Sequence, residues 1–350
     1  MNSNDTIAWF ADIGLDDRSS VGGKGGSLGE LERAGIDVPP GFVVRTNVFE
    51  RFIQALDARA PLRAAIETLD PDQLDAVSAT TKAIRERVLE EPLPADIEAE
   101  VGSAYAALCA DVPDAPVAVR SSATTEDAAD ASFAGLQDTY LWVIGADEVL
   151  KMVRSCWASL YSVESVCYRR RHDFREEDVA MAVVVQRMID ARTAGVMFTR
   201  SPTSGDRSVV TIEGAFGLGS SVVSGEVTPD RWVIAKLTDE ITVRDVSDKH
   251  IKHAPKPGGG VEEVELSNEE RHAPSLSDDE LIRLKAIGQQ TEKHYGRPQD
   301  IEWAIENGTG RIYLLQSRPE TVWSAKDAAP VARPQSDPMK HVLNIFGGRR

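Results

Sequence analysis

The sequence lacks the features that mark membrane, secreted and disulfide-stapled proteins. It has only three cysteines in 350 residues, Cys109, Cys156 and Cys167, with no CxxC or Cys/His spacing, so neither a disulfide framework nor a zinc site is expected. No run of about 18 uninterrupted apolar residues occurs. The start, MNSNDTIAWF, has no basic segment followed by a hydrophobic one. We therefore predict a cytoplasmic protein with buried free thiols, without a signal peptide or membrane span.

Positive charge is also scarce. The 39 Lys and Arg residues are outnumbered by 56 Asp and Glu residues, which gives a formal net charge of −17. This balance argues against broad binding to nucleic acid or to an anionic membrane surface. A small anionic ligand is still compatible with it, but a phosphate must then be held by a local cluster of Arg, Lys, metal and backbone N–H groups.

Apolar periodicity and turn signals predict an α+β fold. Helical patterns dominate the first half, and mixed strands dominate the second, which suggests two lobes with a cleft between them. The predicted helices cover about 46–56, 71–89 with Asp70 as N-cap, 95–110, two pieces within 147–173, and 277–295. The predicted strands cover about 42–44, 116–120 and 139–144, five runs within 179–247, and a hairpin of 300–306 with 311–319.

Two segments are predicted as loops because they are rich in glycine. Gly22 to Gly26 is expected to be a loop that leads into a helix ending near Ala34, and residues 254–265, with Pro-Lys-Pro-Gly-Gly-Gly, are expected to form a surface loop. Residues 326–350 form a Pro/Ala-rich tail with an apolar end. The expected organisation is one unit over 1–325, with lobes of about 1–190 and 191–325, followed by this tail.

Two basic residues stand where a phosphate is a plausible ligand. Lys24 lies among glycines, which permit close approach of a phosphate, although a plain turn explains the pattern equally well. It is not part of a Walker A loop, because that motif needs a Ser or Thr after the lysine and Gly25 stands there. Arg120 ends an apolar run and is followed by Ser121 and Ser122. A guanidinium fixed by a strand end grips phosphate oxygens bidentately. The alternative is a loop staple, in which Arg120 pairs with an acid of the following segment, Glu126 or Asp127.

The predicted C-terminal hairpin is the most informative element. Alternation places Asp300 and Glu302 on one face, and Gln316 and Arg318 share a face on the returning strand. The short turn brings Glu302 and Gln316 near one another. A carboxylate and an amide oxygen beside an arginine suit Mg²⁺ and the phosphates that it bridges. A polar edge of an antiparallel sheet is the alternative reading.

Three further features have two readings each. Gln186 follows the apolar run VAMAVVV and either faces a nucleotide or caps a strand. Glu213 precedes a glycine-rich turn that suits adenosine or ribose hydroxyls, but a strand-ending turn explains it as well. The histidines show no HExxH or triad-like spacing and are expected at the surface: they are His172, His250, His253, His272, His294 and His341.

Several ordered segments together resemble a known family. They are GGKGGSLGEL, VPPGFVV, VAVRSSATTEDAADASFAGLQDTYLWV, GVMFTRSPTSGD, EGAFGLGSSVVSGEVTPDRW, and HYGRPQDIEW with LLQSRPE. These segments resemble the N-terminal ATP-binding domain of the phosphoenolpyruvate synthase family, which includes pyruvate phosphate dikinase and rifampin phosphotransferase. The resemblance implies an ATP-grasp fold with the nucleotide between two α+β lobes, and ATP and Mg²⁺ as cofactors.

The resemblance also implies roles for individual residues. Lys24 and Arg120 contact phosphates, and Arg318 steadies the transferring group, so Arg120 and Arg318 are the predicted catalytic residues. Glu302 and Gln316 hold Mg²⁺ and ATP.

The remaining implied residues concern the nucleotide itself. Gly135 and Thr139 line its cleft, and Gln186 sits beside it. Glu213 is added to the cofactor-binding set from its own sequence context.

One expected feature of the family is missing from this sequence. Full-length members carry a phosphoryl-accepting histidine in a Gly-Gly-x-x-Ser/Thr-His context, which does not occur in these 350 residues. The chain therefore resembles one subunit of a split system such as phenylphosphate synthase, in which a separate subunit carries the histidine and the acceptor site. It is expected to cleave ATP to AMP and phosphate and to serve an alcohol, phenol or enol acceptor. The alternative is a non-catalytic regulatory ATP-binding module.

Overall fold

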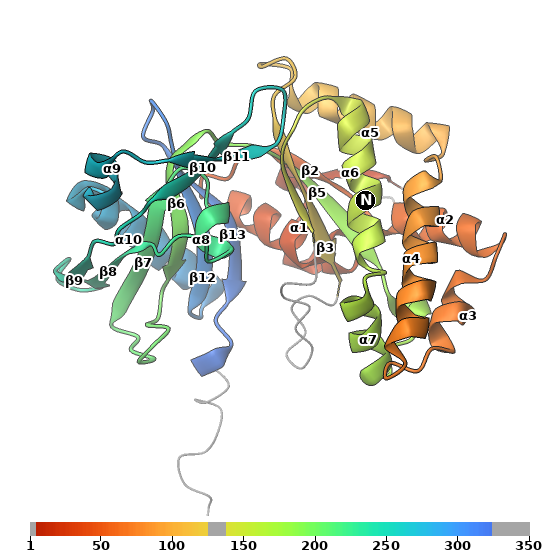
Figure 1. Cartoon of the computed structure of the whole chain (residues 1–350). Coiled ribbons are helices and arrows are strands. Elements are labelled where there is room, and N and C mark those ends of the chain that lie inside the picture. The colour runs from red at the N-terminus through yellow and green to blue at the C-terminus, as the bar shows by residue number, and fades with distance from the viewer. Residues whose placement is uncertain (1–4, 125–137, 324–350) are drawn as a thin grey trace, which may run out of the picture. The chain divides into compact units, whose positions relative to one another are not determined.

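A computed structural model describes residues 5–124 and 138–323 (Figure 1). The chain divides into Met1–Pro319 and Glu320–Arg350, and residues 320–323 are the described part of the second unit. The predicted tail and Gly135 lie outside the described residues. Among the helices that are described, none is long and apolar enough to cross a membrane.

The first sheet has the strand order β1-β2-β5-β3-β4, and all of its neighbouring strands are antiparallel. Its strands are β1 (Ile7–Trp9), β2 (Gly41–Val44), β3 (Val117–Ala123), β4 (Thr139–Val143) and β5 (Met181–Arg187). Both faces of the sheet are covered. Val183 and Val185 pack into the large helical core, whereas Ala182 and Val184 pack with Val21 of helix α1 (Arg18–Arg33). This double burial explains why β5 reads as a continuous apolar run rather than an alternating one.

Helices supply most of the remaining mass around the first sheet (Figure 1). They are α1 (Arg18–Arg33), α2 (Thr46–Asp57), α3 (Leu62–Glu67), α4 (Leu74–Glu90), α5 (Ala95–Leu108), α6 (Ala146–Ser159) and α7 (Val163–Arg171), with the short 3₁₀ turns η1 (Phe10–Asp12), η2 (Leu15–Asp17) and η3 (Glu176–Asp178). Trp157 of α6 is fully buried and lies against Phe49 and Phe52 of α2. These rings form the centre of the larger core.

The second sheet has the strand order β13-β12-β6-β7-β8-β9 and is also antiparallel. Its strands are β6 (Ala191–Phe198), β7 (Val209–Phe216), β8 (Asp230–Ala235), β9 (Ile241–Asp245), β12 (Gln299–Glu306) and β13 (Ile312–Pro319). One face packs against α10 (Asp278–Tyr295), through Ile301, Trp303 and Leu284. The opposite face is therefore the one that carries Asp300 and Glu302, as alternation requires.

A separate two-stranded ribbon accompanies the second sheet. It consists of β10 (Ile251–Pro255) and β11 (Val261–Glu265). The short helix α9 (Asn268–His272) follows it in sequence, and the short helix α8 (Ser220–Val223) lies earlier, between β7 and β8. Part of this ribbon was predicted to be loop, and that prediction is wrong. Only the turn between the two strands is irregular, and its residues Gly258, Gly259 and Gly260 all have positive φ. The residues on either side of this turn pair as strands.

The structure also corrects the prediction around Lys24. The run Gly22 to Gly26 lies within α1 rather than in a loop, and Gly22 alone departs from helical geometry, with φ 71° and ψ 178°. Its glycines allow the helix to approach the first sheet closely, since a Cβ at Gly25 would lie 3.0 Å from Val43. Close packing, not local flexibility, therefore accounts for these glycines.

Other predicted elements are confirmed with small changes at their ends. The α+β class is confirmed, all three cysteines are buried and free, and Ser277 caps α10 in a capping box with Glu280. Asp70 is not the cap of α4, because Asp70 and Gln73 close a turn before the helix begins at Leu74. The first sheet draws on residues 7–187 and the second on 191–319; the predicted lobe and domain boundaries stay predictions.

Candidate functional site

Arg120 connects the two sheets. It lies in the middle of β3, not at a strand end as predicted, because β3 continues to Ala123. Its Nη1 donates to the Leu315 carbonyl at 2.9 Å, and its Nη2 donates to Glu302 Oε2 at 3.1 Å and to Gln316 Oε1 at 2.7 Å. The Arg120 side chain is 10% exposed, and its Nε is buried without a hydrogen-bond partner. The guanidinium is thus held in place with one donor still unsatisfied.

Strand pairing brings the two predicted magnesium ligands together. Glu302 of β12 lies directly opposite Gln316 of β13, and Asp300 lies opposite Arg318. The oxygens of Glu302 and Gln316 accept from the same nitrogen of Arg120, so they converge on one point. A carboxylate oxygen and an amide oxygen are hard donors of the type that Mg²⁺ takes. The residues present therefore fit a magnesium ion.

Glu213 belongs to the same face of the second sheet. Glu302 pairs with Val196 on β6, and Val196 pairs with Glu213 on β7, so the two carboxylates lie in one row across three strands. Burial raises the pKa of the Glu213 carboxyl above its usual value, and the charge of Arg231 partly offsets this shift. The nearest Arg231 nitrogen is 3.9 Å from Glu213 Oε1. Glu213 is therefore held only loosely by a positive partner.

The two predicted catalytic arginines have different surroundings. Arg120 is enclosed, whereas the Arg318 side chain is 53% exposed and lies 3.5 Å from Asp300. A weakly held, exposed guanidinium at the end of a strand has the freedom to follow a substrate group.

The first sheet positions two other predicted residues. Thr139 of β4 lies directly opposite Arg120. Gln186 of β5 pairs with Ala118, two residues before Arg120, and so lies on the same face. The Gln186 side chain is 2% exposed, and its Nε2 donates to the Pro39 carbonyl at 3.3 Å. It sits within the strand rather than capping it.

The hydroxyls beside Arg120 serve the backbone. Ser122 Oγ donates to the Val21 carbonyl at 2.9 Å and accepts from the Gly25 N–H at 3.2 Å, which fastens α1 to β3. Ser121 Oγ donates to the Asp138 carbonyl at 3.2 Å. These hydroxyls therefore fix α1 and Asp138 against the strand that carries Arg120.

Lys24 lies in α1, between Val21 and Gly25, the two residues whose backbone groups bond to Ser122 of β3. Burial raises the pKa of the Cys156 thiol, as does the charge of Asp138, while the Lys24 ammonium partly offsets both. Cys156 itself lies 4.0 Å from the Val119 carbonyl of β3. Lys24 thus belongs to the helix that Ser122 fastens to the strand of Arg120.

A cavity of about 840 Å³ opens beside β4. Its wall includes Thr139, the following β4 residues and the turn of the β10–β11 ribbon. Of the predicted site residues within the described ranges, Thr139 alone belongs to this wall. Gly135, the other predicted cleft residue, lies outside those ranges. The cavity and the Arg120 cluster thus adjoin through one pair of opposed residues, Thr139 and Arg120.

Comparison with known proteins assigns the chain to a class. Residues 18–338 match the family described as "Pyruvate phosphate dikinase, AMP/ATP-binding domain". The chain belongs to this family, as its motifs predicted. The predicted cofactors, ATP with Mg²⁺, agree with this membership, while the roles of individual residues stay predictions.

Particular relatives are phosphoenolpyruvate synthases. The chain is 45% identical to a probable phosphoenolpyruvate synthase of Archaeoglobus fulgidus over 316 residues, which is 90% of this chain and 41% of the relative. It is 40% identical to a phosphoenolpyruvate synthase of Pseudomonas aeruginosa over 336 residues, covering 92% of this chain and 42% of the relative. The chain therefore spans less than half the length of these relatives.

Solved structures give a weaker likeness. A D-alanyl-alanine synthetase A from Vibrio cholerae aligns with 69% of this chain and 54% of its own, at 12% identity and a TM-score of 0.24. This likeness is too weak to support a conclusion.

Proposed function

We propose that the chain is the cytoplasmic ATP-binding subunit of a split phosphotransferase with an ATP-grasp nucleotide site. In the overall reaction, ATP, water and an acceptor hydroxyl give AMP, orthophosphate and a phosphorylated acceptor. The phosphoryl group passes first to a histidine on a partner subunit and then to an alcohol, phenol or enol. Family membership and the convergence of Arg120, Glu302 and Gln316 support this proposal.

The Arg120 contacts are the observation that carries the proposal. A guanidinium buried between two sheets, with Glu302 and Gln316 on one of its nitrogens, is pre-organised for phosphate oxygens. Glu302 and Gln316 would hold Mg²⁺, which neutralises phosphate charge when bound. Arg120 then grips the phosphates from the first sheet, and the pairing of β12 with β13 keeps both oxygen donors on the same face.

The other predicted residues contribute charge and enclosure. Lys24 adds a second positive charge on the α1 side of β3, and Arg318, exposed beside Asp300, steadies the group in transfer. Thr139 and Gln186 border the nucleotide on the first sheet, and Glu213 reaches its hydroxyls from the second. Such a site acts by positioning and charge neutralisation, and it needs no nucleophile of its own.

The partner is inferred from the histidine motif. The Gly-Gly-x-x-Ser/Thr-His context is absent from the 350 residues, and the chain covers 41% and 42% of the two phosphoenolpyruvate synthases described above. A phosphoryl acceptor must then come from outside this sequence, and we assign it to a separate subunit. The acceptor pocket would lie on that subunit.

Phosphorus NMR of the purified chain with MgATP, alone and with a co-purified histidine-bearing subunit, tests the proposal. AMP and orthophosphate should appear with the partner, and Arg318→Ala should suppress them while retaining ATP binding. Lys293→Ala, on α10, is the control and should leave turnover unchanged. Intact ATP in the presence of the partner would support the regulatory alternative, and ADP as the sole product would refute the proposed reaction.

A further inference from the structure

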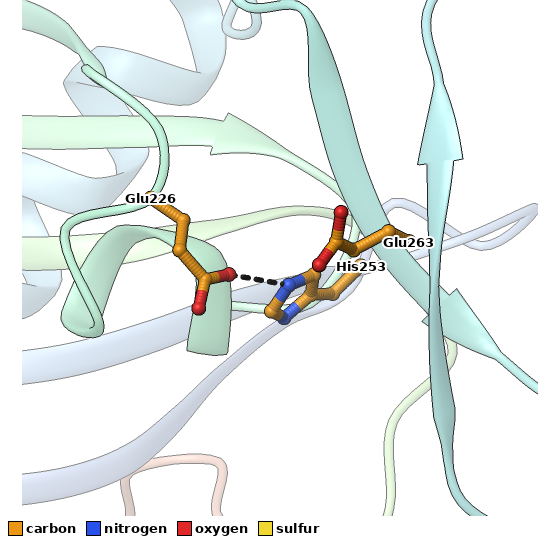
Figure 2. A group of neighbouring side chains, drawn as sticks. All are labelled: Glu226, His253 and Glu263. Atoms are coloured by element: carbon orange, nitrogen blue, oxygen red, sulfur yellow. Dashed lines mark ion pairs between the residues drawn. The ribbon is translucent and has the colours of Figure 1, made fainter.

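The β10–β11 ribbon carries a second cluster of potential ligands (Figure 2). His253 of β10 and Glu263 of β11 are direct cross-strand partners, so they share one face of the ribbon. Glu226, from the segment after α8, reaches the same place. Figure 2 shows the three side chains turned toward one another, and one ligand atom of each lies within 4.8 Å of the others.

The His253 ring is held in a fixed orientation. Its Nδ1 lies 2.7 Å from Ser220 Oγ, and its side chain is 13% exposed. The His253 carbonyl also accepts from the Leu218 N–H at 2.9 Å, which ties β10 to the turn that leads into α8. A histidine whose second ring nitrogen is engaged in this way is oriented as metal-binding histidines are. Nε2 is left to face the two carboxylates.

The charges around Nε2 are unbalanced. Nε2 lies 2.8 Å from Glu226 Oε2, so either a proton or a cation must lie between them. A proton on Nε2 serves one carboxylate only, yet Glu263 lies within the same group. Two carboxylates brought together repel each other, and a divalent cation between them removes that repulsion.

The surroundings of the cluster also favour a cation. Ser220, Glu226, His253 and Glu263 all belong to the wall of the 840 Å³ cavity, together with Glu148 and Glu262. No lysine or arginine occurs among the described residues of this wall. The cavity therefore offers four carboxylates and an imidazole to whatever enters it.

We propose that Glu226, His253 and Glu263 bind one divalent transition-metal ion, with Zn²⁺ as the best match. Imidazole nitrogen and carboxylate oxygen at three positions suit Zn²⁺, whose fourth position then opens on the cavity. Ligand atoms around tetrahedral zinc lie about 3.3 Å apart. The Glu226 carboxylate therefore needs to move about 0.5 Å away from Nε2. All three ligand atoms, which lie within 4.8 Å of one another, then adjust to the zinc spacing.

The ion would have a defined structural effect. It would join both strands of the ribbon to the segment after α8, while the turn of the ribbon is bonded to the first sheet through the Gly260 N–H and the Trp142 carbonyl at 2.9 Å. Binding would therefore stiffen the part of the cavity wall that Gly258, Gly259 and Gly260 form. This site is separate from the magnesium ligands assigned under the proposed function.

Titration of the chelator-treated full chain with Zn²⁺, without nucleotide, tests the site by calorimetry. We expect one equivalent to bind, and the dissociation constant to rise at least about 10-fold in Glu263→Gln and in His253→Gln. Co²⁺ should give visible absorption bands in the wild type that His253→Gln removes. Glu263 is exposed, so its variant tests the ligand without disturbing the core.

Two matched variants distinguish this site from a general charge effect and from binding at the nucleotide site. Glu265→Gln removes the same charge from the same face of β11, two residues away, and should leave zinc affinity unchanged. Glu302→Gln should also leave it unchanged, even if MgATP binding fails. Zinc affinity equal in the wild type and Glu263→Gln would overturn the proposal, as would loss of zinc binding in Glu302→Gln, which would move the ion to the nucleotide site.

Discussion

Glu302 and Gln316 face each other across β12 and β13, and both accept hydrogen bonds from one nitrogen of Arg120. The arginine comes from the first sheet and the two acceptors come from the second. A single nitrogen atom of Arg120 thus contacts two residues that lie 182 and 196 positions further along the sequence. This arrangement leads to the first two predictions.

Arg120→Lys should weaken MgATP binding, because an ammonium keeps the charge but loses the planar fork. Loss of one to two charge-assisted hydrogen bonds corresponds to an increase in Kd of about 10- to 100-fold. Isothermal titration calorimetry with MgATP measures this dissociation constant. Arg187→Lys, on β5 and paired with Asp111, is the matched control. An unchanged Kd for Arg120→Lys would remove Arg120 from the phosphate site.

Glu302→Gln should raise the Mg²⁺ concentration needed for ATP binding by about 10-fold, because a neutral amide holds a hard cation less well than a carboxylate. The measurement is a magnesium titration in which binding of a fixed concentration of a fluorescent ATP analogue is monitored by its fluorescence. Asp300→Asn alters the next carboxylate on the same face and should have the smaller effect. Equal shifts in both variants would indicate a general charge effect and not a ligand.

Gly22→Ala should lower the free energy of unfolding. Gly22 has φ 71° and ψ 178°, a region that side chains avoid, and an added Cβ would lie 2.1 Å from the Ser122 carbonyl oxygen. We expect a loss of at least about 2 kcal/mol in the free energy of unfolding, measured by urea denaturation. Gly102→Ala in α5 meets nothing within 4 Å and should be neutral or stabilising by up to about 1 kcal/mol. The reverse order would contradict this account of α1.

Arg169→Met should also be strongly destabilising. The Arg169 and Glu176 side chains are 0% and 2% exposed, and Arg169 also donates to the Leu160 carbonyl and to Ser165. Removing one member of a buried pair leaves the other charge uncompensated and costs about 3–5 kcal/mol. Arg175→Met breaks an exposed pair with Asp178 and should barely shift the urea midpoint. Similar shifts in both variants would show that burial of the pair is unimportant.

Glu213 should make stability depend on pH. Burial raises the pKa of its carboxyl above the usual value, so the folded chain holds this proton more tightly than the unfolded chain. Its contribution to the free energy of unfolding therefore falls as pH rises between the two pKa values. Glu213→Gln should match the wild type near pH 4 and be more stable at pH 7, in urea melts without nucleotide.

The exposed Glu240 provides the control for that comparison. Glu240→Gln should track the wild type at both pH values. A stability gain in Glu213→Gln that is equal at pH 4 and pH 7 would mean that the substitution acts through packing rather than through proton binding.

Local patterns predicted much of the fold because they report burial directly. The alternation of Asp300 and Glu302 with Ile301 and Trp303 placed the right side chains on the polar face of β12. Ser277 correctly indicated the start of α10. Such signals depend on neighbours within a few residues, which a sequence displays.

Other features were out of reach because they depend on distant contacts. The glycines around Lys24 look flexible in sequence, yet they form helix because β3 and Val43 lie against them. His253 was expected at the surface, but its ring is fixed by Ser220, 33 residues earlier. Its cross-strand pairing with Glu263 was missed since the ribbon was taken for a loop. Strand-forming residues on both sides of Pro-Lys-Pro-Gly-Gly-Gly were the available signal.

Ser27 of α1 donates to the Ser317 carbonyl of β13 at 2.6 Å, across 290 residues of sequence. The backbone N–H of Leu314 likewise reaches back to the Asp37 carbonyl at 2.9 Å. During synthesis on the ribosome, α1 therefore lacks these contacts until β13, the last of the described strands, has been made. Long-range closure of this kind slows folding. A nascent chain stopped before β13 would expose the backbone edge of β12 and leave Arg120 with Glu302 but without the Leu315 carbonyl and Gln316. The pairing of β13 is therefore the step that completes the site.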